Sequence, residues 1–589
     1  MLSPAQQLAA TTPGHVLIAA CPGSGKTTVL KHRAQFLLEQ DDGSRLAAVT
    51  FTREAAESLR ERIVSQFRPA AKRMDAGTFH SLCIGQLTAS NRRVTICTGG
   101  KTAMLIRGAI ARCPLADPGL KYEDYLAAIE AWQREVTPSI PPAESSPLSF
   151  VYREYNADKR RMGLMDFGDI MRETVIGMRA GTVPPLRVQY MLVDEFQDTD
   201  AMQLAWCLEH AARGVHVTIV GDDDQSIYGF RGSLGYEGML DFQRTTGATL
   251  INLDRTYRCS REILQPAARL ISGNPARVAK SLMTASSAPG QVLIRGYEDR
   301  EAEADALIAE LALADDPSSW AILARTNSQL EVIECRIGDR FPFVRKKGES
   351  FWELRAPALL LGLASSLGRG DMLGVSDLLT AGGVSKSFLD GMASQFQFER
   401  PGALSRFCET RLPRGGGDRA FVAHIQESLQ VWREMVGSGK TSQVKMAVGG
   451  MATTVLKYGR WSERELADTE SRLSNAARSL SNANGSMSQR VQALTRKNQD
   501  KNAAGVALLT LHASKGLEYD NVWMVGVDTG TLPSVKEGSD VQEERRLAYV
   551  GMTRARTKLV ISYAQSNTAS PFLAEAGLMH NALLSRPAA

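Results

Sequence analysis

The sequence predicts an α/β protein whose parallel strands carry polar residues at their carboxyl ends. Three observations favour this fold class. The apolar run 15–20 leads into a glycine-containing loop and then a helix-like stretch, 26–39. Two further apolar runs, 190–193 and 215–220, each end in acidic residues. Because parallel strands present their carboxyl ends at one edge of a sheet, we expect these three ends to meet in a single site.

The loop after the first run has the composition of a P-loop. Residues 20–27 read Ala-Cys-Pro-Gly-Ser-Gly-Lys-Thr, with alanine where the general pattern begins with glycine. Gly23 and Gly25 would let backbone N–H groups surround a β-phosphate, and Lys26 would reach the β- and γ-oxygens. Thr27 would offer its hydroxyl to Mg²⁺. The loop therefore predicts binding of a nucleoside triphosphate together with Mg²⁺.

Residues after the other two runs predict hydrolysis of that nucleotide. Asp194 is expected to hold Mg²⁺ through water, and Glu195 to act as general base toward the attacking water. After the third run, Gln225 is placed to sense a γ-phosphate. Tyr228 and Phe230 follow it and offer two aromatic faces.

Ten short blocks extend this interpretation beyond the P-loop. In chain order they cover residues 2–6, 20–27, 48–56, 77–81, 194–199, 221–232, 253–258, 324–327, 510–518 and 544–556. Together they resemble the UvrD/Rep family of superfamily 1 DNA helicases over residues 2 to about 565. The resemblance implies two RecA-like P-loop core domains with parallel sheets, each carrying a mainly helical insertion. The sequence departs from the family pattern at Cys21-Pro22, at Thr28 in place of arginine and at Phe230 in place of tryptophan.

The resemblance implies further contacts to ATP. Gln6 would read the adenine, Tyr257 would stack on it, and Glu518 would meet the ribose. Ser24 and Thr28 complete the expected nucleotide loop.

Two arginines are expected to serve the reaction itself. Phosphoryl transfer spreads negative charge over the γ-phosphate, and an arginine from another domain stabilises that charge only when the domains close. By resemblance, Arg258 and Arg554 do this. Hydrolysis would then drive a closing and opening stroke.

Single-stranded DNA and its junctions with duplex are the expected partners. Aromatic side chains suit this task because every base has a π-face on which a ring can stack. Phe51 and the pair Phe79–His80 stand at loop edges, which favours DNA contact over the usual burial of phenylalanine. The full set of expected DNA contacts is Phe51, Thr52, Thr78, Phe79, His80, Tyr228, Phe230, Arg325 and His512.

The motif order also predicts the division of the chain. Because the P-loop and Asp194 serve one Mg²⁺, residues 1–89 and 190–252 should form a first core domain around a helical insertion, 90–189. A second core domain is expected at 253–345 and 503–566, around a helical insertion, 346–502, with a short tail at 567–589. Residues 346–502 contain 22 lysines and arginines against 15 acidic residues. This insertion either faces a polyanion or has a mildly basic solvated surface.

Composition narrows the class of protein. With 43% hydrophobic and 23% charged residues, and no apolar stretch near the roughly 18 residues of a membrane span, we expect a soluble protein. The start of the chain has no basic leader, and eight cysteines without a C-x-x-C pair favour the reducing cytoplasm over a zinc or disulfide framework.

The leading hypothesis is an ATP-dependent translocase on single-stranded DNA that unwinds duplexes with 3′-to-5′ polarity, the polarity being implied by the resemblance alone. One alternative is the motor subunit of a nuclease, repair or anti-phage complex with weak unwinding of its own. Another is a P-loop ATP switch, which would have no use for aromatic residues at loop edges.

Overall fold

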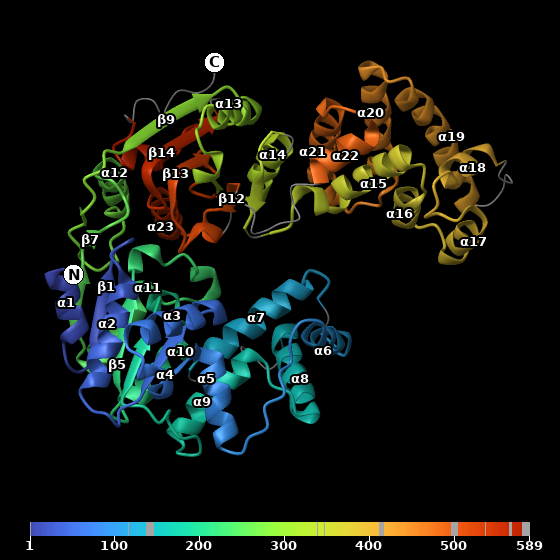
Figure 1. Ribbon diagram of the computed structural model, residues 1–589. Coiled ribbons are helices and arrows are strands. Elements are labelled where there is room, and N and C mark those ends of the chain that lie inside the picture. The colour runs from blue at the N-terminus through green and yellow to red at the C-terminus, as the bar shows by residue number, and fades with distance from the viewer. Residues whose placement is uncertain are drawn as a thin grey trace. The chain divides into compact units, whose positions relative to one another are not determined.

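The computed structural model describes residues 2–115, 117–136, 146–337, 340–346, 348–410, 417–495, 505–535, 538–564 and 568–579. The end of the expected tail, 580–589, lies outside the described residues. The chain forms two compact units (Figure 1). The first runs to Gly290 and also takes in α23 (Val541–Met552), and the second begins at Gln291. Each unit contains one six-stranded sheet.

The sheet of the first unit is parallel throughout, with strand order β3-β2-β4-β5-β1-β6. In strand β1, Ile18 pairs with Val220 of β5 on one side and with Ile251 of the edge strand β6 on the other. The strands are β1 (Val16–Ala20), β2 (Leu46–Thr50), β3 (Met74–Thr78), β4 (Tyr190–Val193), β5 (His216–Gly221) and β6 (Thr249–Leu253). Strands β1 and β2 are buried along their whole length, as expected where helices cover both faces of a sheet.

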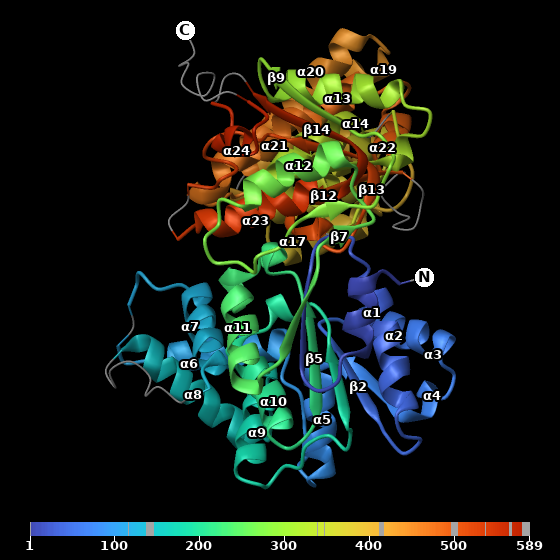
Figure 2. The same ribbon diagram turned by 90° about the vertical axis from the view of Figure 1, so that its left-hand side faces the viewer.

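Helices cover the first sheet on both faces, and Figure 2 shows α1 to α4 on one side of β5 with α9 to α11 on the other. One face packs around Leu30 and Ile63, and the other around Trp206 and Phe242. The helices are α1 (Pro4–Thr11), α2 (Lys26–Glu39), α3 (Arg53–Gln66), α4 (Ala70–Arg73), α5 (Phe79–Ala89), α9 (Phe167–Arg179), α10 (Ala201–Ala211) and α11 (Gly235–Thr246).

Three helices between β3 and β4 have an apolar core of their own. They are α6 (Gly100–Ala111), α7 (Tyr122–Arg134) and α8 (Pro147–Met162). Their core includes Ile106, Ile129 and Tyr155. The next helix, α9, instead contributes Ile170 and Met171 to the core beside the sheet. Helix α9 lies within the segment expected as the first insertion, but it packs with the core of the first sheet.

The residues after β6 also pack in the first unit. They include β7 (Arg255–Thr256), α12 (Arg261–Ile271) and β8 (Met283–Thr284). The sequence analysis assigned residues from 253 onward to the second core domain. The structure differs because Lys280 is buried against acids that follow β5, and the backbone N–H of Tyr257 donates to the Gly23 carbonyl at 2.9 Å.

The second unit repeats the architecture with the strand order β11-β12-β10-β13-β14-β9, again parallel throughout. Its core gathers Trp320, Ile322 and Trp523. The elements are β9 (Gln291–Tyr297), α13 (Arg300–Ala312), β10 (Trp320–Ala324), α14 (Asn327–Ile337), β11 (Phe343–Arg345), β12 (Val506–Thr510), β13 (Tyr519–Val525), β14 (Ala555–Ala564) and α24 (Pro571–Glu575).

The described residues between β11 and β12 form helices around a single apolar cluster that contains Leu360, Phe407 and Met451. They are α15 (Arg355–Arg369), α16 (Leu373–Ala381), α17 (Lys386–Phe396), α18 (Ala403–Glu409), α19 (Gly417–Gly437), α20 (Thr441–Tyr458), α21 (Glu463–Asn482) and α22 (Met487–Thr495). Across the described parts of the chain, no helix combines the length and apolar character that crossing a membrane requires.

Candidate active site

The P-loop connects β1 to α2 by means of two glycines in left-handed conformations. Gly23 has φ +71° and Gly25 has φ +81°. A Cβ atom on Gly23 would lie 2.6 Å from the Cβ of Arg258, so this position has no room for a side chain. The loop opens α2 at Lys26, and the N-terminus of a helix attracts phosphate through its unpaired N–H groups and dipole.

Lys26 is bound to the predicted general base. Its Nζ donates to Glu195 Oε1 at 2.7 Å. Burial acts to lower the pKa of Lys26, but the Glu195 and Asp194 carboxylates outweigh it and the pKa is raised. Lys26 therefore keeps its charge, and each partner neutralises the other.

Asp194 follows β4, and its Oδ1 accepts the backbone N–H of Glu195 at 2.9 Å. Burial, reinforced by the neighbouring charge of Glu195, raises the pKa of Asp194 to about 6. A bound cation would favour the ionised form. Thr27 and Asp194 offer a hydroxyl and a carboxylate, the hard oxygen donors that Mg²⁺ prefers, so this donor set fits the expected ion.

A chain of hydrogen bonds joins the predicted base to the predicted γ-phosphate sensor. Gln197 Nε2 donates to Glu195 Oε2 at 2.6 Å, and Gln197 Oε1 accepts the backbone N–H of Asp222 at 2.9 Å. Asp222 Oδ2 then accepts from Gln225 Nε2 at 2.6 Å. Gln197 had no predicted role, although it lies two residues after Glu195 within the block 194–199. The chain links the ends of β4 and β5.

Three consecutive acids, Asp222 to Asp224, lie close enough together to hold a metal ion. Cations of the protein already occupy this position. Lys280 Nζ lies 2.7, 2.8 and 2.9 Å from the three carboxylates in turn, and Arg277 lies 2.7 Å from Asp224. The cluster is thus an internal salt-bridge network, and it ties the segment after β6 to the end of β5. No pattern in the sequence predicted that Lys280 pairs with these acids.

Three other expected ATP residues meet the loop within the first unit. Gln6 Nε2 donates to the Ser24 carbonyl at 2.9 Å. Tyr257 binds the Gly23 carbonyl through its backbone and leaves its side chain half exposed. Arg258 packs on Gly23 and donates from Nη1 to the Thr553 carbonyl at 3.3 Å. Arg258 therefore shares a unit with the P-loop, whereas the sequence analysis expected it to come from another domain.

Four of the predicted residues belong to the second unit. Arg325 follows β10, and His512 opens a short 3₁₀ helix after β12. Arg554 is buried before β14 and donates from Nη1 to the Leu517 carbonyl at 3.1 Å. Glu518, the residue after Leu517, forms an ion pair with Arg556.

The predicted DNA contacts at the ends of β2 and β3 differ in exposure. Phe51 is 36% exposed and meets Phe79 edge-on at 5.7 Å. Phe79 is only 1% exposed and packs on Trp206 at 5.6 Å, so its ring belongs to the core. Thr52 and Thr78 accept backbone N–H groups of α3 and α5, as N-caps do.

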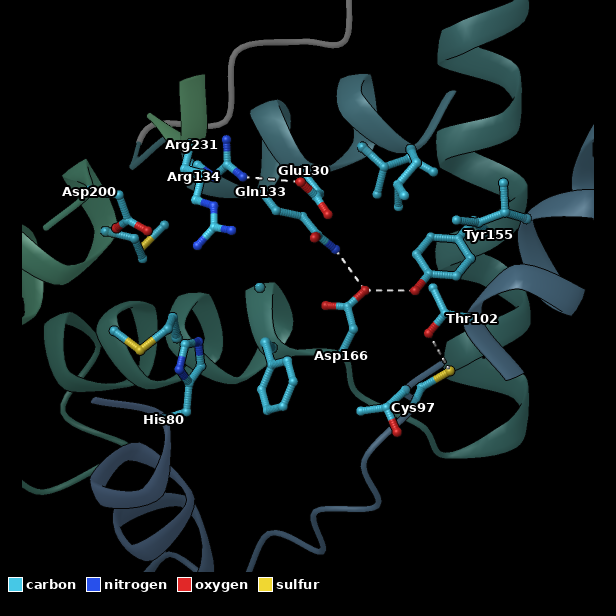
Figure 3. A pocket seen from close by; sticks show the side chains of 18 of the residues that line it. His80, Cys97, Thr102, Glu130, Gln133, Arg134, Tyr155, Asp166, Asp200 and Arg231 are labelled. Atoms are coloured by element: carbon cyan, nitrogen blue, oxygen red, sulfur yellow. Dashed lines mark hydrogen bonds and ion pairs between the residues drawn. The ribbon is translucent and has the colours of Figure 1, made fainter. Parts of the chain in front are cut away.

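A cavity of about 920 Å³ lies between helices α6 to α8 and the starts of α5, α9 and α10 (Figure 3). His80 lines it and meets Phe167 edge-on at 4.9 Å. Phe230 also lines it, is 65% exposed, and lies 6.1 Å from Tyr228 with the Arg231 guanidinium over both rings. Sequence reasoning gave no role to Phe167, whose 47% exposure at the start of α9 only the structure reveals.

Two parallel sheets, with a P-loop and its acidic partners on the first, define a nucleotide hydrolase with two RecA-like domains. Family models match as well: the UvrD/REP helicase N-terminal domain over residues 2–246, and the UvrD-like helicase C-terminal domain over residues 424–566. The chain belongs to the UvrD/Rep family of superfamily 1 DNA helicases.

Similar proteins extend along nearly the whole chain. The ATP-dependent DNA helicase PcrA of Bacillus subtilis (strain 168) is 28% identical over 630 residues, covering 96% of this chain and 83% of the relative. PcrA of Staphylococcus aureus (strain Mu50) is 27% identical over 632 residues, with 96% and 84% covered. PcrA of Leuconostoc citreum is 26% identical over 630 residues, with 96% and 83% covered.

Proposed function

We propose that this chain, an ATP-dependent DNA helicase, moves along single-stranded DNA from 3′ to 5′ and separates duplex at the junction. The observation that carries the proposal is one unit that holds both a P-loop hydrolysis site and exposed aromatic rings near it. The polarity rests on family membership. A cytoplasmic location, proposed from the cysteine pattern, suits a DNA substrate.

ATP binding is proposed to release the general base. Lys26 now donates to Glu195, and the β- and γ-oxygens of ATP would compete for that ammonium group. Glu195 would then be free to accept a proton from the attacking water. Mg²⁺, held by Thr27 and Asp194, would neutralise charge on the phosphates. Gln225 would detect the γ-phosphate and pass its state to Glu195 through Asp222 and Gln197.

Arg258 and Arg554 would act on the phosphates from different units. Arg258, packed on the P-loop, would meet the phosphates from within the first unit. Arg554 is carried by the second unit, so its contribution requires contact between the two units at the nucleotide. Stabilisation of the transition state by Arg554 would then couple hydrolysis to domain closure.

DNA would bind mainly through its bases. Phe51, His80, Phe167, Tyr228 and Phe230 provide edges and faces for stacking, which contributes about 1–3 kcal/mol per base and reads no sequence. Arg325 and His512 would add contacts from the second unit, and Thr52 and Thr78 contacts at helix starts. Affinity should fall as salt rises, because bound phosphates release counterions.

The direct test is the ATPase rate with and without single-stranded oligonucleotides of different sequence. We expect stimulation by every sequence, with affinities that agree within about tenfold because stacking ignores base edges. An ATPase that ignores DNA would instead support a P-loop switch. A DNA-stimulated ATPase that displaces bound protein but leaves duplexes intact would favour a motor subunit.

A further inference from the structure

His80, Phe167 and Phe230 form an aromatic wall on one side of the cavity. The position of Phe167 in this wall depends on how α9 begins, because Phe167 is the first residue of that helix. Asp166 is the N-cap of this helix: its Oδ1 accepts the backbone N–H of Asp169 at 2.9 Å, and Asp169 Oδ2 accepts the backbone N–H of Asp166 at 3.0 Å. Such a reciprocal cap fixes the entry direction of a helix. The direction of Phe167 is therefore set at Asp166.

Three side chains from the neighbouring helices converge on the second oxygen of that cap. Asp166 Oδ2 accepts from Lys159 Nζ at 2.5 Å, from Gln133 Nε2 at 2.8 Å and from Tyr155 Oη at 2.9 Å. Figure 3 shows Gln133 and Tyr155 reaching it from opposite sides. A carboxylate with this many donors has little freedom to turn.

Lys159 is the centre of this cluster. Only 1% of it is exposed on α8, although lysine side chains are mostly exposed in folded proteins. Its Nζ also lies 2.6 Å from Asp169 Oδ2 and 4.4 Å from the centre of the Tyr155 ring. Burying an ammonium is costly unless it is well paired, so a lysine here constrains geometry more than it adds stability.

Helix α7 touches both segments that carry exposed rings into the cavity. Gln133 lies against the residue after Phe167, since a Cβ on Gly168 would come within 2.5 Å of Gln133 Oε1. Arg134 lies against the residue after Arg231, since a Cβ on Gly232 would come within 3.1 Å of Arg134 Cδ. Adjacent residues at the end of α7 thus brace Phe167 and the Phe230 loop.

We infer that Lys159 and Gln133 are positioning residues for single-stranded DNA, which hold Asp166 so that Phe167 stays in the aromatic wall with His80 and Phe230. The inference rests on the proposed DNA contacts of that wall. Neither residue needs to touch DNA. Through this cluster, helices α7 and α8 set the geometry of rings that stand on the sheet side of the cavity.

The test is a mutant cycle on affinity for a fluorescein-labelled poly-dT strand. Lys159→Met and Gln133→Met should each weaken binding about tenfold, the loss of roughly one good stacking contact. Lys159→Arg should restore affinity, and basal ATPase should not change. Arg161→Met is the matched control, because Arg161 lies on the same helix with an exposed side chain and pairs with Asp158 instead of Asp166. It should bind as the parent does.

The decisive comparison repeats both changes in a Phe167→Ala background. If Lys159 and Gln133 act through Phe167, they cause no further loss there, because effects through one shared group do not add. An equal loss in both backgrounds, or no loss in the parent, would overturn the inference. Lys159→Met removes the cation that pairs with the buried Asp166 and the half-buried Asp169, and it can unfold the insertion. Gln133→Met keeps those ion pairs, so it decides in that case.

The same data separate this inference from the proposed function. If Phe167→Ala alone leaves poly-dT affinity unchanged, the proposed DNA wall is wrong and the inference falls with it. If Phe167→Ala weakens binding and the two positioning variants do not, only the inference is wrong.

Discussion

At the scale of residues, the site is a set of paired charges that ATP must rearrange. Lys26 and Glu195 are bound to each other, and Glu195 adopts φ +54°, a left-handed conformation that is rare outside glycine. Backbone strain of this kind is often found where a side chain must be held in one direction. Here the Glu195 side chain, the predicted general base, is directed toward the P-loop lysine.

Glu195→Gln tests the role of the base. The variant should bind ATP and lose turnover by about 10²–10⁴, the usual contribution of a general base. Nucleotide affinity and single-turnover hydrolysis would be measured together. Loss of ATP binding instead would mean that Glu195 is needed to build the site.

Asp194 gives a pH-dependent prediction. Its folded pKa, about 6, lies above the ordinary value, so its contribution to stability is full below the ordinary pKa and is lost as pH rises through 6. Without nucleotide and Mg²⁺, the free energy of unfolding of Asp194→Asn should therefore exceed that of the parent at pH 8 by on the order of 1–2 kcal/mol. At pH 5 this difference should be smaller. Thermal unfolding at both pH values measures this. A variant that is less stable at pH 8 would contradict it.

Phe230 allows a test of stacking, since it stands where the family often has tryptophan. Phe230→Ala should weaken binding of single-stranded DNA about five- to a hundredfold, and Phe230→Trp should preserve it or strengthen it, because a larger ring stacks better. Fluorescence anisotropy with poly-dT would report both. Leu8→Ala, another exposed apolar residue of the first unit, is the control. Equal affinities for all four proteins would place the DNA elsewhere.

At the scale of elements, the P-loop depends on glycines that have no room for a side chain. Gly23→Ala would push a Cβ into Arg258 and hold an alanine at φ +71°, so ATP affinity should fall at least tenfold. Gly14→Ala is the matched control, because Gly14 has φ +75° with nothing near its Cβ position. Gly14→Ala therefore has the same backbone strain as Gly23→Ala, but its Cβ atom meets no neighbouring atom. ATP binding that is equal in both variants would contradict the steric argument.

The sequence was sufficient to predict elements with local signals. Buried strands appear as apolar runs, and the P-loop as glycines at fixed spacing. It could not predict Lys280, because a salt bridge between residues 58 apart leaves no periodic pattern. It could not decide between Phe79 in the core and Phe167 at the cavity either. Each is the first residue of a helix, and only the packing of α5 and α9 separates them.

At the scale of the whole molecule, every residue proposed for the ATP site lies outside residues 346–502. Replacing this segment with a short flexible linker should leave DNA-stimulated ATPase and change unwinding, because its surplus of positive charge suits duplex phosphates. Lost unwinding would mean that it grips duplex, and increased unwinding that it restrains the motor. A folded deletion protein without DNA-stimulated ATPase would show that the segment is needed for ATP hydrolysis.

The central claim is that ATP hydrolysis drives directed movement on one DNA strand. It is tested most directly by strand separation on two duplexes that are identical except for a single-stranded tail, 3′ on one and 5′ on the other. We predict ATP-dependent separation of the 3′-tailed duplex and little of the 5′-tailed one. Preference for the 5′ tail, or separation without ATP, would contradict the account.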